Sequence, residues 1–217
     1  MSTRSVPVTD ELHDYLVAHG SPPDEVASDL YAETRRILPA DAEMQVAPEQ
    51  AALLTLLTRL VGARNAVEVG TFTGTSALAI ARGLPPDGRL ICCDVSEEYT
   101  SIARRFWRRA GVEDRIDLRI APAVQTLRAL PTEPHLDLAF IDADKTGYPT
   151  YWAELVPRMR PGGLIGVDNV FRNGRVLSPV SEADRVVADF NAAVAADDRV
   201  EVVMLPLADG MTLARRR

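Results

Sequence analysis

Residues 66–76 read AVEVGTFTGTS, and this stretch indicates the class of fold. Its first residues form a short apolar run typical of a buried strand, and its threonines and glycines form a turn. The following segment, TSALAIARGL at residues 75–84, has apolar residues at the spacing of a helix. A strand, a glycine-containing turn and a helix in this order are the beginning of a β-α-β unit.

The alternation of strands and helices continues from this unit to the C-terminus. Further strands are expected at residues 89–94, 116–120, 136–142 and 164–168, with helices at residues 96–111, 121–130, 150–159 and 181–196. Residues 200–216 predict a terminal hairpin that turns at Ala208, Asp209 and Gly210. The pattern predicts an α/β fold in which a largely parallel sheet carries helices on both faces, because right-handed crossovers place them there.

Helices are also expected before the first strand. The segments are residues 8–20, with Thr9 or Asp10 as N-cap and Gly20 as C-cap, residues 22–38, and residues 48–63. A chain of 217 residues accommodates one substantial domain with an N-terminal extension. We place the extension at residues 1–45.

Composition is ordinary for a soluble globular protein, with 47% hydrophobic and 25% charged residues. No apolar run approaches the ~20 residues that cross a membrane, and the N-terminus lacks a signal-peptide core. We therefore expect a cytoplasmic protein, with Cys92 and Cys93 as buried thiols on opposite faces of one strand. The net charge of −7 gives no general attraction for nucleic acid. The arginines in residues 104–109 are interpreted as a solvated helix face around Trp107.

The first strand ends in residues that favour one cofactor over another. Glycines at Gly70 and Gly74 let a cofactor approach the backbone, but the G-x-G-x-x-G pattern of a nicotinamide dinucleotide site is missing. Glu68 would repel a phosphate and hold an ammonium group, which fits S-adenosylmethionine. Asp94, at the end of the second strand, is placed to accept the hydroxyls of a ribose. The alternative for Asp94 is the N-cap of the next helix, a role that Ser96 serves equally well.

Oxygen-bearing side chains end the next two strands, in FIDADK at residues 140–145 and LIGVDN at residues 164–169. Two carboxylates, Asp142 and Asp168, and the amide of Asn169 suit Mg²⁺, Mn²⁺ or Ca²⁺ rather than zinc. Lys145 is the single lysine among 24 basic residues, and a lysine amine is able to lose its proton. The alternative is that Asp142 and Asp144 cap a helix and that Asp168 and Asn169 form an Asx turn.

These motifs carry a resemblance to a known family. MQVAPEQAALL, EVGTFTGTSAL, FIDADKTGY and PGGLIGVDNVFRNGRV are similar to segments of the cation-dependent O-methyltransferases, which include the catechol and caffeoyl-CoA enzymes. The resemblance implies a Rossmann-like class I methyltransferase fold, whose seven-stranded sheet is mostly parallel with an antiparallel last strand. It also implies that residues 46–217 form the methyltransferase domain, that residues 1–45 belong to the substrate or dimer region, and that the protein is a homodimer.

The resemblance assigns roles to individual residues. Those implied for the S-adenosylmethionine site are Val46, Glu68, Gly70, Thr71, Ser76, Asp94, Ala123 and Asp142. Those implied for the metal are Asp142, Asp168 and Asn169, with Lys145 as the catalytic base or its positioning partner. Those implied or suggested for the acceptor are Met44, Lys145, Tyr148, Tyr151, Trp152, Phe171, Arg172 and Asn173.

The acceptor expected from this pattern is a small aromatic molecule with two neighbouring hydroxyl groups. The short connection at residues 128–137 and the Phe171-Arg172 pair, which differs from the plant enzymes, argue against a large acyl-CoA ester. One alternative is a methyltransferase acting on a hydroxylated uridine of tRNA, against which the acidic composition argues. Another is a non-catalytic or NAD-binding protein of similar fold.

Overall fold

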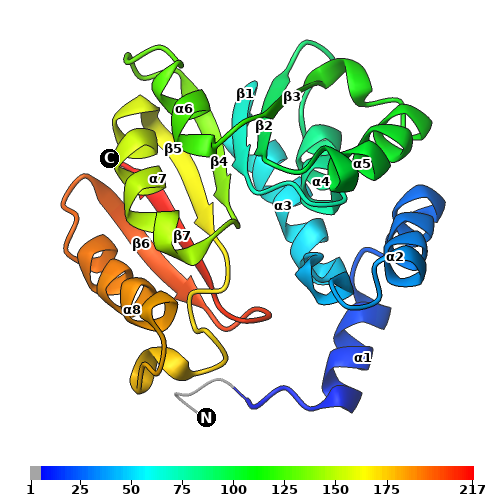
Figure 1. Ribbon diagram of the computed structural model, residues 1–217, viewed down its shortest axis with the longest axis horizontal. Helices are drawn as coiled ribbons and strands as arrows, with labels where there is room; N and C mark the ends of the chain where they lie inside the picture. The colour runs from blue at the N-terminus through cyan, green and yellow to red at the C-terminus, as the bar shows by residue number, and fades with distance from the viewer. Residues whose placement is uncertain (1–5) are drawn as a thin grey trace.

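The computed structural model describes residues 6–217 as a sheet of seven strands covered by helices on both faces (Figure 1). The strands are β1 (Asn65–Val69), β2 (Arg89–Asp94), β3 (Ile116–Ile120), β4 (Leu136–Ile141), β5 (Met159–Val167), β6 (Val200–Leu205) and β7 (Met211–Arg216). Their order is β3-β2-β1-β4-β5-β7-β6. The pairs among β1 to β5 are parallel, and β7 runs antiparallel to both β5 and β6. The predicted fold class and the terminal hairpin are therefore confirmed.

The helices divide between the two faces of the sheet. They are α1 (Asp10–His19), α2 (Glu25–Ile37), α3 (Pro48–Val61), α4 (Thr75–Gly83), α5 (Glu97–Arg109), α6 (Ala123–Arg128), α7 (Tyr148–Leu155) and α8 (Glu182–Ala195). Short 3-10 turns lie at η1 (Ala42–Met44), η2 (Glu113–Arg115), η3 (Lys145–Gly147), η4 (Val156–Arg158) and η5 (Arg175–Leu177). Helices α2 to α5 lie on one side and α6 to α8 on the other (Figure 1).

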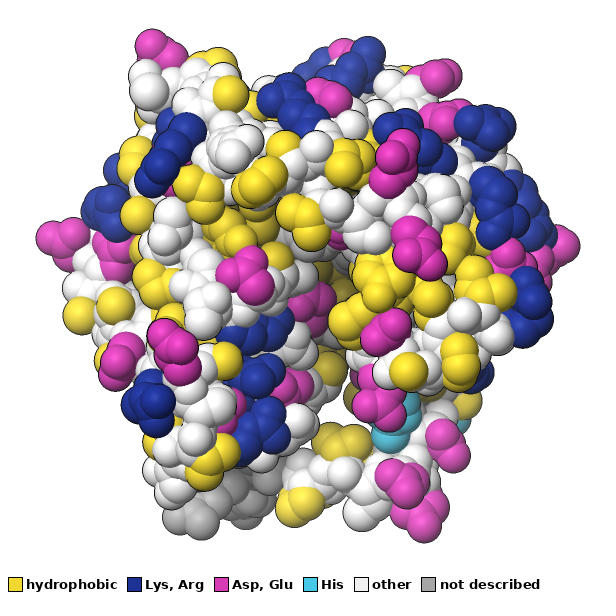
Figure 2. Space-filling model, viewed as in Figure 1, with side chains coloured by type: hydrophobic (Ala, Val, Ile, Leu, Met, Phe, Trp, Pro, Cys, Tyr) yellow, Lys and Arg dark blue, Asp and Glu magenta, His cyan; other side chains and the backbone are white. Residues whose placement is uncertain are grey.

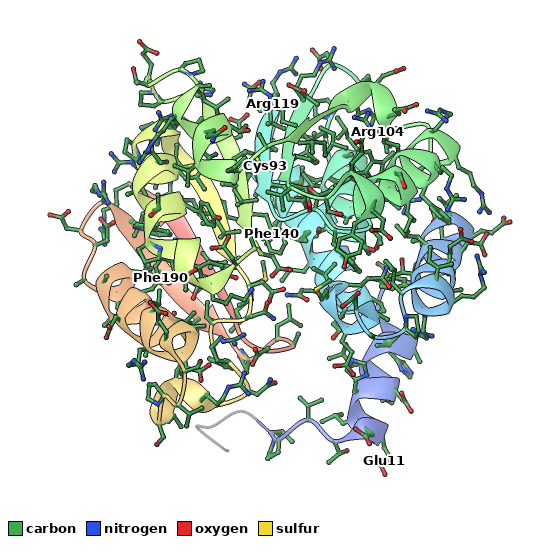
Figure 3. The ribbon with its side chains drawn as sticks, viewed as in Figure 1. Glu11, Cys93, Arg104, Arg119, Phe140 and Phe190 are labelled. Atoms are coloured by element: carbon green, nitrogen blue, oxygen red, sulfur yellow. The ribbon has the colours of Figure 1, made fainter. Side chains whose placement is uncertain are left out.

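Each face of the sheet has its own apolar core. Alternate residues of a strand point to opposite faces, so Cys92 lies in the cluster that includes Trp107, whereas Cys93 lies in the cluster with Leu127. Both thiols are buried and free, as predicted. In Figure 3 the labelled Phe140 lies near the middle of the sheet, and Phe190 extends from α8. The rings of Tyr148 and Phe190 meet edge to face, which joins α7 to α8.

The two largest differences from the predicted boundaries lie next to prolines. The seventh helix ends at Leu155 and passes into η4, because Pro157 interrupts regular helical hydrogen bonding. Strand β5 then begins at Met159, five residues before the apolar run that predicted it. Its first half contains Pro161 and two glycines, which weaken the strand pattern, and the pairing with β4 is irregular at this point.

The arginine-rich segment of α5 connects two helices. Trp107 is buried and donates from Nε1 to the carbonyl of Gly74 at 3.1 Å, while the arginines around it are exposed. Arg105 pairs with Glu33 and Arg109 with Asp29, both on α2. The interpretation as a solvated face is confirmed, and the ion pairs add a link to α2.

The N-terminal helices differ in how firmly they join the core. Helix α2 buries Ala27 and Leu30 in the α3–α5 core, whereas α1 buries no residue and contacts α3 through His13 and Glu49 at 3.2 Å. Residues 1–5 of the predicted extension lie outside the described residues, and its boundary at residue 45 stays a prediction. None of the helices in residues 6–217 is long and apolar enough to cross a membrane.

Asp137 anchors the amino ends of the central strands, opposite the edge that carries the polar motifs. Its Oδ2 accepts from the amides of Arg64 and Asn65 at 2.8 and 2.7 Å, and its Oδ1 accepts from Arg160 Nε at 2.5 Å. Burial alone would raise the pKa of Asp137, but the amides and Arg160 outweigh burial and lower the pKa. The ionised carboxylate therefore stabilises the fold.

We predict that Asp137→Ala lowers the free energy of unfolding by about 3 kcal/mol, because it leaves buried donors without an acceptor. Urea denaturation at pH 7 measures this loss. The matched control is Asp87→Ala, which removes the exposed partner of the Arg64 side chain and should cost under about 1 kcal/mol. Equal losses in the two variants would contradict the anchoring role.

The same interaction predicts a pH dependence. Because the folded pKa of Asp137 is lowered, its contribution is present above the unfolded pKa of about 4 and is lost as the pH falls through the folded value. The stability gap between the wild type and Asp137→Asn should therefore shrink on acidification below about pH 4.

Candidate active site

The polar motifs meet at the carboxyl ends of β1, β4 and β5. Strand order reverses between β1 and β4, which is where open α/β sheets bind their ligands. The sheet hydrogen bonding continues one residue beyond the strands, since Asp142 N donates to Val69 O at 2.8 Å and Asp168 N donates to Ile141 O at 3.0 Å. The backbone therefore fixes both aspartates at neighbouring strand ends.

Lys145 joins the two predicted ligand motifs. Its Nζ donates to Asp142 Oδ1 at 3.0 Å, to Asn169 Oδ1 at 2.8 Å and to Tyr148 Oη at 2.6 Å. Tyr148 is buried and donates to the carbonyl of Asp168 at 2.9 Å. The single lysine of the chain is therefore held at the centre of the predicted site by residues from the ends of β4 and β5 and from α7.

The three predicted metal ligands fit a hard cation. Asp142 Oδ1 and Asn169 Oδ1 both lie within hydrogen-bonding distance of one cationic atom, Lys145 Nζ. Burial and the nearby Asp142 raise the pKa of Asp168 to about 7. The positive charge around the two carboxylates is therefore too small to compensate both of them. Asn169 adopts a left-handed backbone with φ 54°, which asparagine tolerates better than most residues.

The ligand set is mixed rather than purely acidic. Within residues 6–217 no group of three His, Cys, Asp or Glu side chains is arranged to hold a metal ion. Two carboxylates with one amide oxygen match the preference of Mg²⁺ and similar hard ions. The alternative in which Asp142 and Asp144 cap a helix is met only in part: Asp144 stands at the N-cap position of η3 but makes no side-chain cap hydrogen bond. Asp142 lies three residues before η3, and its carboxylate contacts Lys145.

Glu68 lies at the predicted cofactor side of the same edge. It is fully buried, and neither carboxylate oxygen has a hydrogen-bond partner among the described residues. Burial raises the pKa of Glu68 to about 7; Ser76, Thr71 and Cys92 moderate the rise without forming hydrogen bonds of normal geometry. A buried carboxylate without a partner is costly, and a bound cation would relieve that cost.

Gly70 and Asp94 shape the loop between β1 and α4. Gly70 has φ 93°, and a Cβ there would lie 1.9 Å from the carbonyl oxygen of Asp142, so a larger residue does not fit. Asp94 Oδ2 accepts from the amides of Thr71 and Phe72 at 2.9 and 2.8 Å. Ser96, not Asp94, is the N-cap of α5. The helix-cap alternative for Asp94 is wrong, and its ribose role stays a prediction.

The other predicted cofactor residues lie on separate elements. Thr71 and Ser76 are buried beside Glu68, and Ala123 is the first residue of α6. Val46 is buried, and its carbonyl accepts from Tyr31 Oη at 2.8 Å. Met44, predicted near the acceptor, is half exposed at the end of η1.

The aromatic residues suggested for the acceptor pocket belong mainly to the core. Trp152 is buried between α7 and α8, where its Nε1 donates to Asp197 Oδ2 at 2.9 Å and its ring meets Phe190. Tyr151 is also buried and donates to Asp144. Trp152 and Tyr151 are therefore not carried into the proposed acceptor site, and Tyr148 acts through its contacts to Lys145 and Asp168.

The segment after Asn169 is held against the β6–β7 turn. Phe171 N donates to Asp209 O at 2.9 Å, and the Phe171 ring packs so closely on Gly210 that a Cβ there would lie 2.5 Å away. Asn173 N donates to Asp209 Oδ1 at 2.5 Å. Arg172 Nε donates to Asp184 Oδ1 at 3.3 Å. Phe171 therefore has a packing role, while the Asn173 side chain is exposed.

Sequence reasoning missed Gln50 and Asp184. Gln50 is buried in the first turn of α3, where its Oε1 accepts from Ala47 N at 3.3 Å and its amide lies near enough to Asp168 to lower the pKa of that carboxyl. Asp184 is buried on α8 between two arginines. Gln50 interrupts an apolar helical pattern, which is a usable signal, but nothing local marks Asp184.

Comparison with known proteins agrees with this geometry. Residues 19–217 match the family model described as "O-methyltransferase". The chain is 37% identical over 227 residues to caffeoyl-CoA O-methyltransferase 2 of Zea mays, covering 98% of this chain and 85% of that protein. It is 42% identical over 171 residues to catechol O-methyltransferase domain-containing protein 1 of Mus musculus, covering 76% and 65%.

A solved structure agrees as well. The O-methyltransferase TomG from Streptomyces achromogenes, which is involved in tomaymycin synthesis and was solved with S-adenosylmethionine, superimposes with a TM-score of 0.86. The two chains are 30% identical over 95% of this chain and 96% of that one. The fold and site thus define a class I methyltransferase that depends on S-adenosylmethionine. The chain belongs to the O-methyltransferase family that includes the caffeoyl-CoA and catechol enzymes. The alternative of a non-catalytic or NAD-binding protein is therefore wrong.

We predict that Glu68→Gln stabilises the ligand-free protein by about 2 kcal/mol at pH 8, because it removes a buried charge. A raised carboxyl pKa makes folding less favourable as the pH rises from the unfolded value toward about 7, so the gain should be much smaller at pH 5 than at pH 8. Urea denaturation at both pH values measures it. An equal gain at pH 5 and pH 8 would show that charge is not the cause.

Proposed function

We propose that this enzyme moves a methyl group from S-adenosylmethionine to one hydroxyl of a catechol-like small molecule, with the help of a divalent metal ion. The observation that carries the proposal is that Asp142 Oδ1 and Asn169 Oδ1 both lie within 3.0 Å of Lys145 Nζ, next to the buried Asp168. Two carboxylates and an amide oxygen would hold Mg²⁺, Mn²⁺ or Ca²⁺. The names of the maize and mouse relatives support a diol acceptor.

Glu68 would bind the ammonium group of S-adenosylmethionine, since its buried carboxylate has no partner of its own. Asp94 would accept the ribose hydroxyls, as part of the same loop that Gly70 and Thr71 form. The remaining residues that we assign to the cofactor are Val46, Ser76, Ala123 and Asp142. The complex of the Streptomyces relative with S-adenosylmethionine supports this assignment.

When bound, the metal would lower the pKa of a coordinated phenol and leave positions for the two oxygens of a diol. Lys145 would take or stabilise the phenol proton at Nζ, and Tyr148 would hold that atom in place by its 2.6 Å contact. Positioning the ionised oxygen in line with the methyl carbon would supply much of the rate enhancement.

The acceptor would rest against the segment that follows Asn169. Arg172 and Asn173 would contact it, and Met44 would lie across the opening from η1. A net charge of −7 argues for a small molecule rather than tRNA. We further propose that the enzyme works as a homodimer in the cytoplasm, as many of its bacterial and plant relatives are expected to be dimers.

A first prediction concerns the metal. EDTA should abolish turnover of the wild type, and Mg²⁺ should restore it. Asp168→Ala should weaken Mg²⁺ or Mn²⁺ binding, measured by calorimetry, by at least about tenfold, since it removes one of three ligands. Asp144→Asn is the matched control, because Asp144 contacts Tyr151 instead and should retain metal affinity. Full activity in EDTA would refute the metal role.

A second prediction concerns Lys145. Lys145→Arg retains a positive charge but replaces an amine that can deprotonate with a group that cannot. We expect kcat to fall by about 100-fold, the usual contribution of a positioned proton acceptor. Steady-state kinetics at saturating diol and metal measure the loss. Turnover equal to that of the wild type would show that Lys145 acts only as a charge.

A further inference from the structure

We propose that the acceptor carries a carboxylate close to its diol ring, and that Arg172 recognises it. This inference rests on the proposed function and narrows it from catechol-like molecules in general to anionic ones. The evidence is an excess of positive charge in the segment between β5 and α8, which follows the predicted metal ligands directly along the chain.

Two arginines in this segment share one buried carboxylate. Asp184 Oδ1 accepts from Arg172 Nε at 3.3 Å and from Arg175 Nε at 3.2 Å, and only 1% of the Asp184 side chain is exposed. Its Oδ2 accepts from the amide of Ser181 at 3.2 Å. Burial tends to raise the pKa of Asp184, but Ser181 and Arg175 outweigh it and lower the pKa to about 2. The cluster therefore contains two positive charges and one negative charge.

Both arginines contact Asp184 through Nε alone. Within residues 6–217 the Nη atoms of Arg172 and Arg175 make no hydrogen bond, although a guanidinium usually binds a carboxylate with two parallel donors. The Arg172 side chain is 21% exposed, so its Nη donors have access to a ligand. A planar group with two free donors is suited to a second carboxylate.

Arg172 lies close to the predicted metal ligands along the chain. Arg172 lies four residues after Asp168 and three after Asn169, on the segment that leaves the end of β5. Residues 172 to 174 all have left-handed backbones, and the neighbouring amides bond to Asp209 and Gly210. Figure 2 shows basic side chains beside the central hollow, over this part of the molecule.

Arg175 makes it possible for Arg172 to change partners. If the Arg172 guanidinium turns toward an acceptor, Asp184 retains Arg175 and the Ser181 amide, so no buried charge is left without a partner. A single arginine on Asp184 would not permit this exchange. A positively charged acceptor, such as a catechol with an amine, would instead face the excess cation and be disfavoured.

The test compares two diols that differ only in charge, 3,4-dihydroxyphenylacetate and 3,4-dihydroxyphenylacetamide. The methylene group separates the substituent from the ring, so the hydroxyl groups of the two compounds have similar acidity. We expect the wild-type enzyme, with Mg²⁺ present, to show kcat/KM at least about tenfold higher for the carboxylate, as for a partly buried charge-assisted pair. The ratio should fall as salt is added.

Variants assign the preference to Arg172. Arg172→Gln should lower the carboxylate-to-amide ratio to within about twofold of one, whereas Arg172→Lys should retain an intermediate preference, because it keeps the charge but loses the paired donors. The matched control is Arg185→Gln, an exposed arginine on α8 whose loss should leave the ratio unchanged. Thermal unfolding checks that each variant is folded, and the wild-type ratio remains informative if Arg172→Gln does not fold.

Each outcome decides the inference. A wild-type ratio near one, a preference for the amide, or an Arg172→Gln variant that keeps the ratio would overturn it. So would a tenfold preference for the coenzyme A thioester of a dihydroxycinnamic acid over the free acid. Methyl transfer to neither diol, with S-adenosylmethionine and Mg²⁺ bound, would instead refute the proposed catechol-like acceptor, and this inference with it.

Discussion

The structure depends on one electrostatic constraint: two carboxylates are held at the ends of adjacent parallel strands, where little positive charge is present to compensate them. Sheet hydrogen bonds fix the backbone of Asp142 and Asp168 in place, and the Asp168 side chain is buried. Lys145 compensates only part of this charge, and Asp168 keeps a pKa near 7. Such a site is stable only when it is protonated or when it binds a cation, which is why we relate its geometry to metal binding.

A second uncompensated carboxylate, Glu68, lies on the neighbouring strand. Its burial without a hydrogen bond disfavours the ligand-free fold. Asp137, at the opposite end of the central strands, has hydrogen-bond partners and stabilises the fold. The protein thus concentrates unfavourable charge at the edge where we propose that ligands bind and satisfied charge at the opposite edge. This distribution is typical of active sites, where perturbed carboxyl groups gather.

Much of this site was predictable because residue types at strand ends carry their chemistry with them. The strands around Glu68, Asp94, Asp142 and Asp168 were placed correctly, and the arrangement of parallel strands then brought those residues to one edge. The pocket role suggested for Trp152 and Tyr151 was less predictable, for a different reason. An aromatic residue near a site motif can face the core or the pocket, and only the packing of α7 against α8 decides between them.

By itself, the sequence determined the order of strands and helices, the oxygen ligands at the strand ends and the position of the single lysine. These follow from local patterns of two to four residues, which depend on backbone geometry and residue chemistry. Tertiary structure alone decided that Gln50 approaches Asp168, that Tyr148 holds Lys145, and that Arg172 and Arg175 share Asp184. The approach of Gln50 to Asp168 joins elements distant in the chain, and the other contacts depend on how neighbouring segments fold against each other. Burial, which sets how strongly charged groups interact, arises only when the elements pack together.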